Sequence, residues 1–408
     1  MRIENLRTEE AGEQRRVVAD VLWESAPHPA QTLYFSAPYP FAADLQPSPD
    51  AFMLACLPFA VWWGEQRVQI EGALCTQFRD GLQAVMALYA RWYSHCRPLS
   101  IEPQGGYVPT VPRHPARTAS LLSGGIDGLT TLRANRLDYP ASHPEFIRDC
   151  IVLFGAADFE STAEGPVPDR LAAFQRLVSR LQELARSEDF QLIPVHTNTR
   201  LLSRTYTCWQ AVGFGAANVA VTHALSGRFN KVLFASDGNG VDPYPGGSHP
   251  LLDQHFSTAS VQVQHQQAAW TRIDKLRLLA DWPPAMQLMQ PCHYVKIPPE
   301  GRINCGHCEK CVRTMLGLLC IGKLSEAGAF VENTVTPEMI RGIPIHNPGK
   351  AELLEQLVQP LRDAGYADLA REIQRKVLPV HVKQQIRSLV PEPVRRWKRT
   401  LAKKLRPQ

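Results

Sequence analysis

Between residues 118 and 235, short apolar runs alternate with long segments of helical periodicity, and this alternation restricts the possible folds more than any other feature. Four runs have the length and composition of buried strands: Ala119–Leu122, Cys150–Phe154, Phe190–Val195 and Lys231–Ala235. Helical patterns at 169–187 and 208–225 lie between the later runs. Unbroken apolar runs are typical of parallel sheets, whose strands are buried on both faces. The sequence therefore predicts an α/β fold in which helices flank a parallel sheet.

The chain has 408 residues, enough for two or three domains, and the rest of it divides around this segment. Before it, Arg67–Gly72 reads as a strand and 81–95 as an amphipathic helix, whereas prolines interrupt 97–117. We predict four parts: an α+β region at 1–117, the parallel-sheet domain at 118–285, a cysteine-containing helical lobe at 286–378 and a basic amphipathic tail at 379–408.

A glycine-rich loop follows the first predicted strand and opens a predicted helix. Glycines permit positive φ and close backbone approach, so successive N–H groups can surround an anion at the helix N-terminus. A carboxylate beside a phosphate needs a cation between them, and Mg²⁺ commonly supplies it. We therefore predict a phosphate site, with glycines that serve only strand-to-helix packing as the alternative. Its candidate residues are Ser123, Gly124, Gly125, Asp127, Gly128 and Thr130.

Four of the ten cysteines lie close together in the sequence. Cys305, Cys308 and Cys311 form two overlapping CxxC steps, and Cys292 lies 13 residues upstream of the first. Cysteines at this spacing can hold a tetrahedral metal ion, and four of them make a closed, structural zinc site. An iron–sulfur cluster is the main alternative, and a set of buried reduced thiols is the other.

Further candidates come from strand ends and helix starts. Asp237 follows the strand at 231–235, where a carboxylate can meet substrate or Mg²⁺, although a plain turn is the alternative. His249 lies in a Gly/Pro-rich loop and is a candidate general acid or base, or else an exposed loop histidine. Three cationic residues could meet phosphate, or could instead form salt-bridged surfaces: Arg272, Lys275 and Arg313.

Basic residues are concentrated in the tail, although the whole chain carries a formal net charge of only +5. Residues 383–408 hold nine Lys/Arg and one acidic residue, whereas the remainder has 35 basic and 38 acidic residues. Trp397, Leu401 and Leu405 recur at helical spacing. This tail favours RNA or an anionic membrane surface as a partner, with a solvated tail as the alternative. Since no apolar run approaches ~20 residues and no signal-peptide core begins the chain, we expect a cytoplasmic protein, at most peripheral to the membrane.

The loop resembles the SGGxDS signature of the PP-loop ATPases, or ATP pyrophosphatases, with Gly128 in place of the family's last serine. This resemblance implies a Rossmann-like (HUP-type) sheet that binds ATP and Mg²⁺ at Ser123–Gly128. The order Cys292, Cys305, Cys308, Cys311 and Arg313 also resembles the zinc element of one such family, the 7-cyano-7-deazaguanine synthases. That family has no counterpart of residues 1–117, and its Tyr-Pro-Asp-Cys-Arg segment is replaced here by one beginning at Tyr244, so its substrate is not carried over.

These features together favour an ATP-dependent enzyme. It would adenylate a carbonyl or carboxylate oxygen of a small substrate, release pyrophosphate, and admit an amine, ammonia or sulfur donor. The residues expected to carry the chemistry are Asp127, Asp237 and His249, with Arg313 at the phosphates. Two alternatives remain open: an RNA-modifying enzyme of the same superfamily, or a non-catalytic nucleotide-binding module whose loop has degenerated at Gly128.

Overall fold

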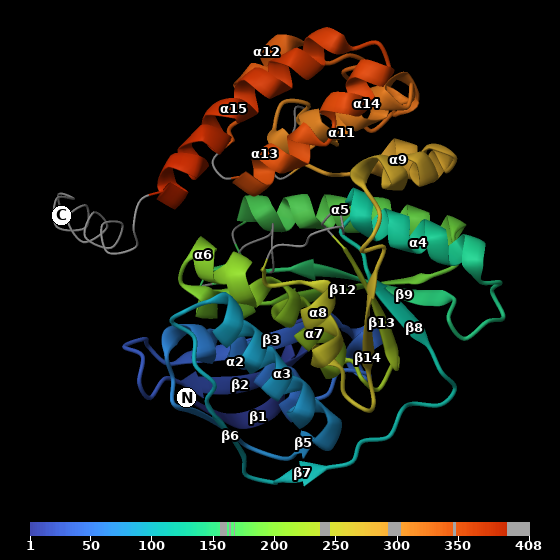
Figure 1. Ribbon diagram of the computed structural model, residues 1–408. Coiled ribbons are helices and arrows are strands. Elements are labelled where there is room, and N and C mark those ends of the chain that lie inside the picture. Colours follow the sequence, from blue (N-terminus) through green and yellow to red (C-terminus); the bar gives the residue numbers. More distant parts are fainter. Residues whose placement is uncertain are drawn as a thin grey trace. The chain divides into compact units, whose positions relative to one another are not determined.

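The computed structural model describes residues 1–155, 161–162, 165–166, 168–236, 245–292, 303–345 and 348–389 (Figure 1). The chain divides into two compact units, Met1–Gly301 and Arg302–Gln408, each described here by itself. The sequence separated 1–117 from 118–285, but both stretches lie within the first unit.

One ten-stranded sheet organises the first unit. Its strand order is β14-β13-β8-β9-β12-β3-β2-β1-β4-β6. The strands are, in chain order, β1 (Arg2–Ala11), β2 (Gln14–Leu22), β3 (Gln31–Pro38), β4 (Arg67–Ile70), β6 (Ser100–Pro103), β8 (Thr118–Leu121), β9 (Ile147–Phe154), β12 (Gln191–Thr197), β13 (Lys231–Ala235) and β14 (Gln262–Gln266). There are also two small two-stranded sheets in the described residues. One pairs β5 (Leu74–Cys75) with β7 (Tyr107–Val108), and the other pairs β10 (Ser161–Thr162) with β11 (Gly165–Pro166).

The five strands from β8 onward form the parallel half of the sheet, which confirms the predicted α/β architecture. It is compatible with a Rossmann-like fold. The four predicted apolar runs correspond to β8, β9, β12 and β13, and β14 adds a fifth strand. The chain moves from β8 outward to β9 and β12, and then returns to β13 on the other side of β8. The strand order therefore reverses between β8 and β13, where open parallel sheets bind ligands at their carboxyl ends.

Helices cover both faces of this sheet (Figure 1). One face carries α4 (Ile126–Asp138), α5 (Pro168–Ser187) and α9 (Arg272–Ala280), and α4 contacts α9 directly. The other face carries α2 (Pro49–Trp63), α3 (Thr76–Trp92), α7 (Phe214–Ala224) and α8 (Pro250–Asp253). The described part of the unit also contains the short α-helices α1 (Tyr39–Ala42), α6 (Tyr206–Cys208) and α10 (Pro283–Leu288).

The N-terminal strands extend the same sheet. Strand β3 pairs antiparallel with β12, through Ser36 opposite His196, and β2 and β1 follow in antiparallel order. Helix α2 packs against α7 and is buried almost all round, from Asp50 to Val61. An apolar cluster that includes Phe35, Phe59 and Trp209 runs through both halves. Residues 1–117 therefore share their sheet and core with the parallel half.

A buried ion-pair network connects the parallel strands near their amino ends. The Asp149 carboxylate is fully buried and accepts hydrogen bonds from the guanidinium groups of Arg117 and Arg228, the latter at 3.0 Å. Arg228 also reaches Asp44 at 2.8 Å. A buried charge requires such pairing because desolvation of an unpaired carboxylate is costly.

The second unit is helical in the residues that the structure describes. Its helices are α11 (Glu309–Cys320), α12 (Pro337–Gly342), α13 (Pro348–Glu355), α14 (Val358–Asp363) and α15 (Ala367–Leu389). Helix α15 packs against α12, α13 and α14. Among the described helices of either unit, none has the length and apolar content to cross a membrane.

Asp50 provides a test of this packing through pH. Burial raises the pKa of its carboxyl to about 6, although the Cys75 N–H donates to it at 3.0 Å. A raised pKa means that stability is present below the unfolded pKa of 3.8 and is lost as pH rises through about 6. We expect Asp50→Asn to stabilise the protein at pH 8 by up to ~3 kcal/mol and to have no effect at pH 3.

Urea unfolding of both proteins between pH 3 and 8 measures this difference. Asp80→Asn is the matched control, because the Asp80 side chain is 64% exposed. Parallel pH profiles for the wild-type protein and Asp50→Asn would contradict the expectation.

Candidate functional site

The glycine-rich loop lies where the strand order reverses. It leaves β8 after Leu121 and enters α4 at Ile126, with Gly125 as the N-cap residue. Gly124 has a φ of +74°, which favours glycine, and the Ser123 side chain is exposed. The N-terminus of α4 therefore faces the carboxyl end of the sheet, where an anion would meet its positive dipole end.

A buried lysine bridges the start of α4 and the end of β13, the two elements that flank this reversal. Lys275, on α9, is only 2% exposed, and its ammonium donates to Asp127 Oδ1 at 2.6 Å and to the carbonyl oxygen of Ser236. Asp127 lies in the first turn of α4, which follows β8, and Ser236 directly follows β13. Arg272, one turn earlier on α9, lies 3.6 Å from the same Asp127 oxygen. Two cations thus surround the carboxylate for which the sequence predicted Mg²⁺.

The hydroxyls of the first turns of α4 are engaged within the fold. Thr130 is fully buried and donates to the Ile126 carbonyl at 2.8 Å, within its own helix. Thr131 donates to Gln267 Oε1 at 2.7 Å, which ties α4 to the residue after β14. Both hydroxyls thus bond to protein atoms.

Gly128 is the position at which the loop departs from the PP-loop signature, and its surroundings are tight. A Cβ added there would lie 3.1 Å from the Leu121 carbonyl oxygen and 3.5 Å from Leu122 Cα. Glycine at 128 therefore lets α4 approach the end of β8 closely. Gly124 thus supplies a positive φ and Gly128 supplies close packing, whereas the phosphate site itself stays a prediction.

His249 lies away from Asp127. It is the N-cap residue of α8, where its Nδ1 accepts the Leu251 N–H at 3.0 Å, and its ring packs on Trp92. Helix α8 contacts α3 on the face of the sheet opposite α4 (Figure 1). The structure therefore does not bring His249 and Asp127 together. Asp237, the third predicted catalytic residue, lies outside the described residues.

Sequence reasoning missed Asp253, which organises the surroundings of His249. Its carboxylate is fully buried and accepts hydrogen bonds from Ser248 Oγ at 2.7 Å and from the His249 N–H at 3.1 Å. His265 Nδ1, on β14, lies 2.8 Å from the same carboxylate. Of its three partners, only His265 lies on another element, β14.

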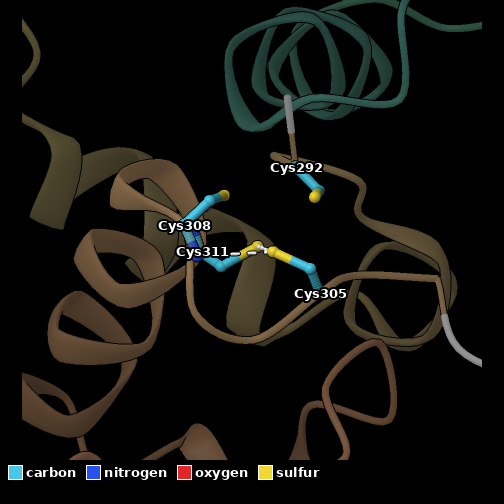
Figure 2. A group of neighbouring side chains, drawn as sticks. All are labelled: Cys292, Cys305, Cys308 and Cys311. Atoms are coloured by element: carbon cyan, nitrogen blue, oxygen red, sulfur yellow. Dashed lines mark hydrogen bonds between the residues drawn. The ribbon is translucent and has the colours of Figure 1, made fainter. Parts of the chain in front are cut away.

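The predicted cysteine cluster forms a compact group of sulfur atoms. The ligand atoms of Cys292, Cys305, Cys308 and Cys311 all lie within 4.8 Å of one another, and Figure 2 shows them around a common space. Sulfurs about 2.3 Å from a tetrahedral zinc lie ~3.8 Å apart. The Cys305 and Cys311 sulfurs have that separation, 3.8 Å. The donor set fits zinc, and the cluster could bind it.

Backbone N–H groups donate hydrogen bonds to two of these sulfur atoms and so hold them in place. The Cys308 N–H donates to Cys305 Sγ at 3.3 Å, and the Cys311 N–H donates to Cys308 Sγ at 3.4 Å, so Cys308 caps α11. Gly306 has a φ of +76°, and a Cβ there would lie 2.4 Å from Glu332 Oε2. The positive φ therefore favours glycine between Cys305 and Cys308.

Arg313, predicted at the phosphates, is a buried residue of α11 in the second unit. Its Nε lies 2.9 Å from Glu309 Oε1, one turn earlier on the same helix. Of the basic tail, the backbone is described to Leu389 and the side chains only to Val382. The candidate RNA or membrane contacts of the tail lie outside the described residues and stay predictions.

We compared the chain with protein-family models, curated proteins and solved structures, and none of them matches.

Gly128→Ala tests the packing at the loop. Its methyl group would lie 3.1 Å from the Leu121 carbonyl oxygen, so we expect the free energy of unfolding to be ~1–3 kcal/mol lower than for Gly342→Ala, in which alanine gains helix propensity without such a contact. Gly342→Ala is the control, because nothing lies within 4 Å of a Cβ there and the helix propensity of alanine is unopposed. Urea unfolding measures both. Equal effects of the two substitutions would show that Gly128 is not needed for packing.

Metal analysis tests the cysteine cluster. We expect one zinc per chain, lost on dialysis against a chelator when any of Cys292, Cys305, Cys308 or Cys311 is changed to Ser, because three thiolates hold zinc less tightly. Cys320→Ser is the matched control, since Cys320 lies at the end of α11 outside this group. Iron with visible absorbance would replace the zinc assignment by an iron–sulfur cluster.

Proposed function

We propose that the first unit binds ATP and Mg²⁺ at the loop Ser123–Gly128 and uses ATP to adenylate an oxygen of a small substrate. The observation that carries this proposal is the buried Lys275 ammonium between Asp127 and the Ser236 carbonyl, at the reversal of strand order. Two cationic side chains and a helix N-terminus at one strand end favour a polyanionic ligand. The resemblance of the loop to the PP-loop signature supplies the class of reaction and the HUP-type assignment of the sheet.

Each group near the loop has a role in this proposal. The N–H groups of Gly124 and Gly125 and the first turn of α4 donate to phosphate oxygens. Lys275 holds Asp127 and the Ser236 carbonyl in position, and its charge, together with that of Arg272, offsets the negative charge of the phosphates. Magnesium, when held by Asp127, supplies further charge neutralisation at the phosphates.

The proposed reaction has two steps. A carbonyl or carboxylate oxygen of the substrate attacks the α-phosphorus, so that a P–O bond forms and the bond to pyrophosphate breaks. An amine, ammonia or sulfur donor then attacks the substrate carbon that carries the adenylated oxygen, and AMP leaves with the electron pair of the broken C–O bond. Asp237 remains a candidate for the substrate pocket. We assign no step to His249, because its Nδ1 caps α8.

The four cysteines are proposed to bind zinc in a structural role. Four protein thiolates complete a tetrahedral shell and leave no position for substrate or water, unlike a catalytic zinc site.

Nucleotide binding tests the proposal through Lys275. Removing one buried charge-assisted contact typically costs ~1.5–3 kcal/mol, so we expect Lys275→Met to weaken ATP binding by roughly 10–100-fold in titration calorimetry with Mg²⁺. Arg277→Met is the matched control on the same helix, because the Arg277 side chain is 66% exposed. A wild-type protein that binds no ATP at millimolar concentration would refute the proposal.

Pyrophosphate release distinguishes an enzyme from a binding module. We would incubate the protein with ATP, Mg²⁺ and panels of small carboxylates and amides, with ammonia present. The adenylating enzyme releases pyrophosphate only with its substrate. If ATP binds and no panel member elicits release, the non-catalytic module gains support.

A further inference from the structure

The segment Met289–Cys292 lies against the glycine-rich loop Ser123–Gly128. The Gln290 N–H donates to the Gly124 carbonyl at 2.7 Å, and both residues belong to the first unit. A Cβ at Gly124 would lie 3.8 Å from Gln290 Cβ and 3.2 Å from Leu177 Cδ1. The loop is therefore closely covered on this side by Gln290 and α5.

The same segment is anchored on the helices around it. Arg180, on α5, donates through its guanidinium to Gln290 Oε1. Met289 is fully buried, and its N–H donates to the Ala285 carbonyl at 2.9 Å, which continues from α10. Up to Gln290, the path of the chain is thus fixed by packing and hydrogen bonds.

The hydrogen bond from the Gln290 N–H to the Gly124 carbonyl orients the peptide unit whose N–H, that of Gly125, would contact phosphate. The Gly124 carbonyl and the Gly125 N–H belong to one planar peptide unit and point in opposite directions. Holding the Gly124 oxygen therefore also fixes the direction of the Gly125 N–H. Glycine at both positions leaves this peptide unit otherwise free to rotate.

Cys292 follows Gln290 after a single residue, Pro291. Two residues span at most ~7 Å, and proline fixes its own φ near −65°. Cys292 is also one of the four clustered thiols. A metal ion on these thiols would therefore restrain the chain within two residues of the hydrogen bond that orients the loop.

We propose that metal binding at the four cysteines controls whether the Ser123–Gly128 loop can bind phosphate. With metal bound, Cys292 is fixed, the Gln290 N–H holds the Gly124 carbonyl, and the Gly125 N–H points to the ligand. Without metal, the end of the 289–292 segment is released, the hydrogen bond opens more often, and the loop loses its orientation. This inference rests on the proposed function only for the identity of the ligand.

Hydrogen exchange and ATP binding test the coupling on the full-length protein, loaded with zinc or stripped by a chelator. We expect stripping to speed amide exchange in peptides that cover 120–131 and 283–292, and to weaken ATP binding by tenfold or more. Cys292→Ser should reproduce both effects, whereas Cys320→Ser should not. Peptides from β1–β3 report whether the first unit stays folded.

Pro291→Gly separates coupling from metal loss. This variant keeps all four thiols, so it should bind zinc with the wild-type stoichiometry. Its flexible link should transmit less restraint, and we expect a smaller difference in exchange at 120–131 between the loaded and stripped forms.

Equal exchange at 120–131 in loaded and stripped wild-type protein would overturn the coupling, whatever the affinity for ATP. If zinc changes the exchange but the loaded protein binds no ATP, the coupling holds and the proposed nucleotide site fails. If ATP binds equally well with and without zinc, the nucleotide site holds and metal control fails.

Discussion

Lys275 is only 2% exposed, so its ammonium group needs oxygen atoms of the protein as hydrogen-bond acceptors. The two acceptors lie on either side of the strand-order reversal. Asp127 lies in the first turn of α4, which follows β8, and the Ser236 carbonyl lies at the end of β13. Strands β8 and β13 are neighbours only in the folded sheet. Because an unpaired buried charge is costly, these contacts restrict how α4, α9 and the two strand ends can be arranged. The candidate site follows from that restriction.

Much of the parallel half could be predicted, because strands buried on both faces leave apolar runs such as Lys231–Ala235 that periodicity identifies. The antiparallel strands were missed for the complementary reason. Along β1, half-exposed positions carry charges such as Arg7 and Glu9, which pair with each other at 2.7 Å on the surface. Their pairing partners determine these strands more than their own composition does, so a local pattern does not reveal them.

The candidate site was predictable to the extent that its residues are close in sequence. The loop Ser123–Gly128 and the CxxC steps are local patterns with a local physical reason. The roles of Lys275 and Gln290 depend on contacts between distant segments, and a buried lysine has no sequence signature that separates it from an exposed one. Thr130 shows the converse, since a hydroxyl in the expected place bonds to its own helix instead.

The antiparallel pairing of β3 with β12 has a consequence for the order of folding. Ser36 on β3 pairs with His196 on β12. During synthesis, β3 therefore has no β12 to pair with until most of the first unit has left the ribosome. Until then its outer edge offers unpaired N–H and C=O groups to any other extended chain. Contacts between such distant residues also slow folding. Nascent chains that stall before β12 would thus be prone to intermolecular strand pairing.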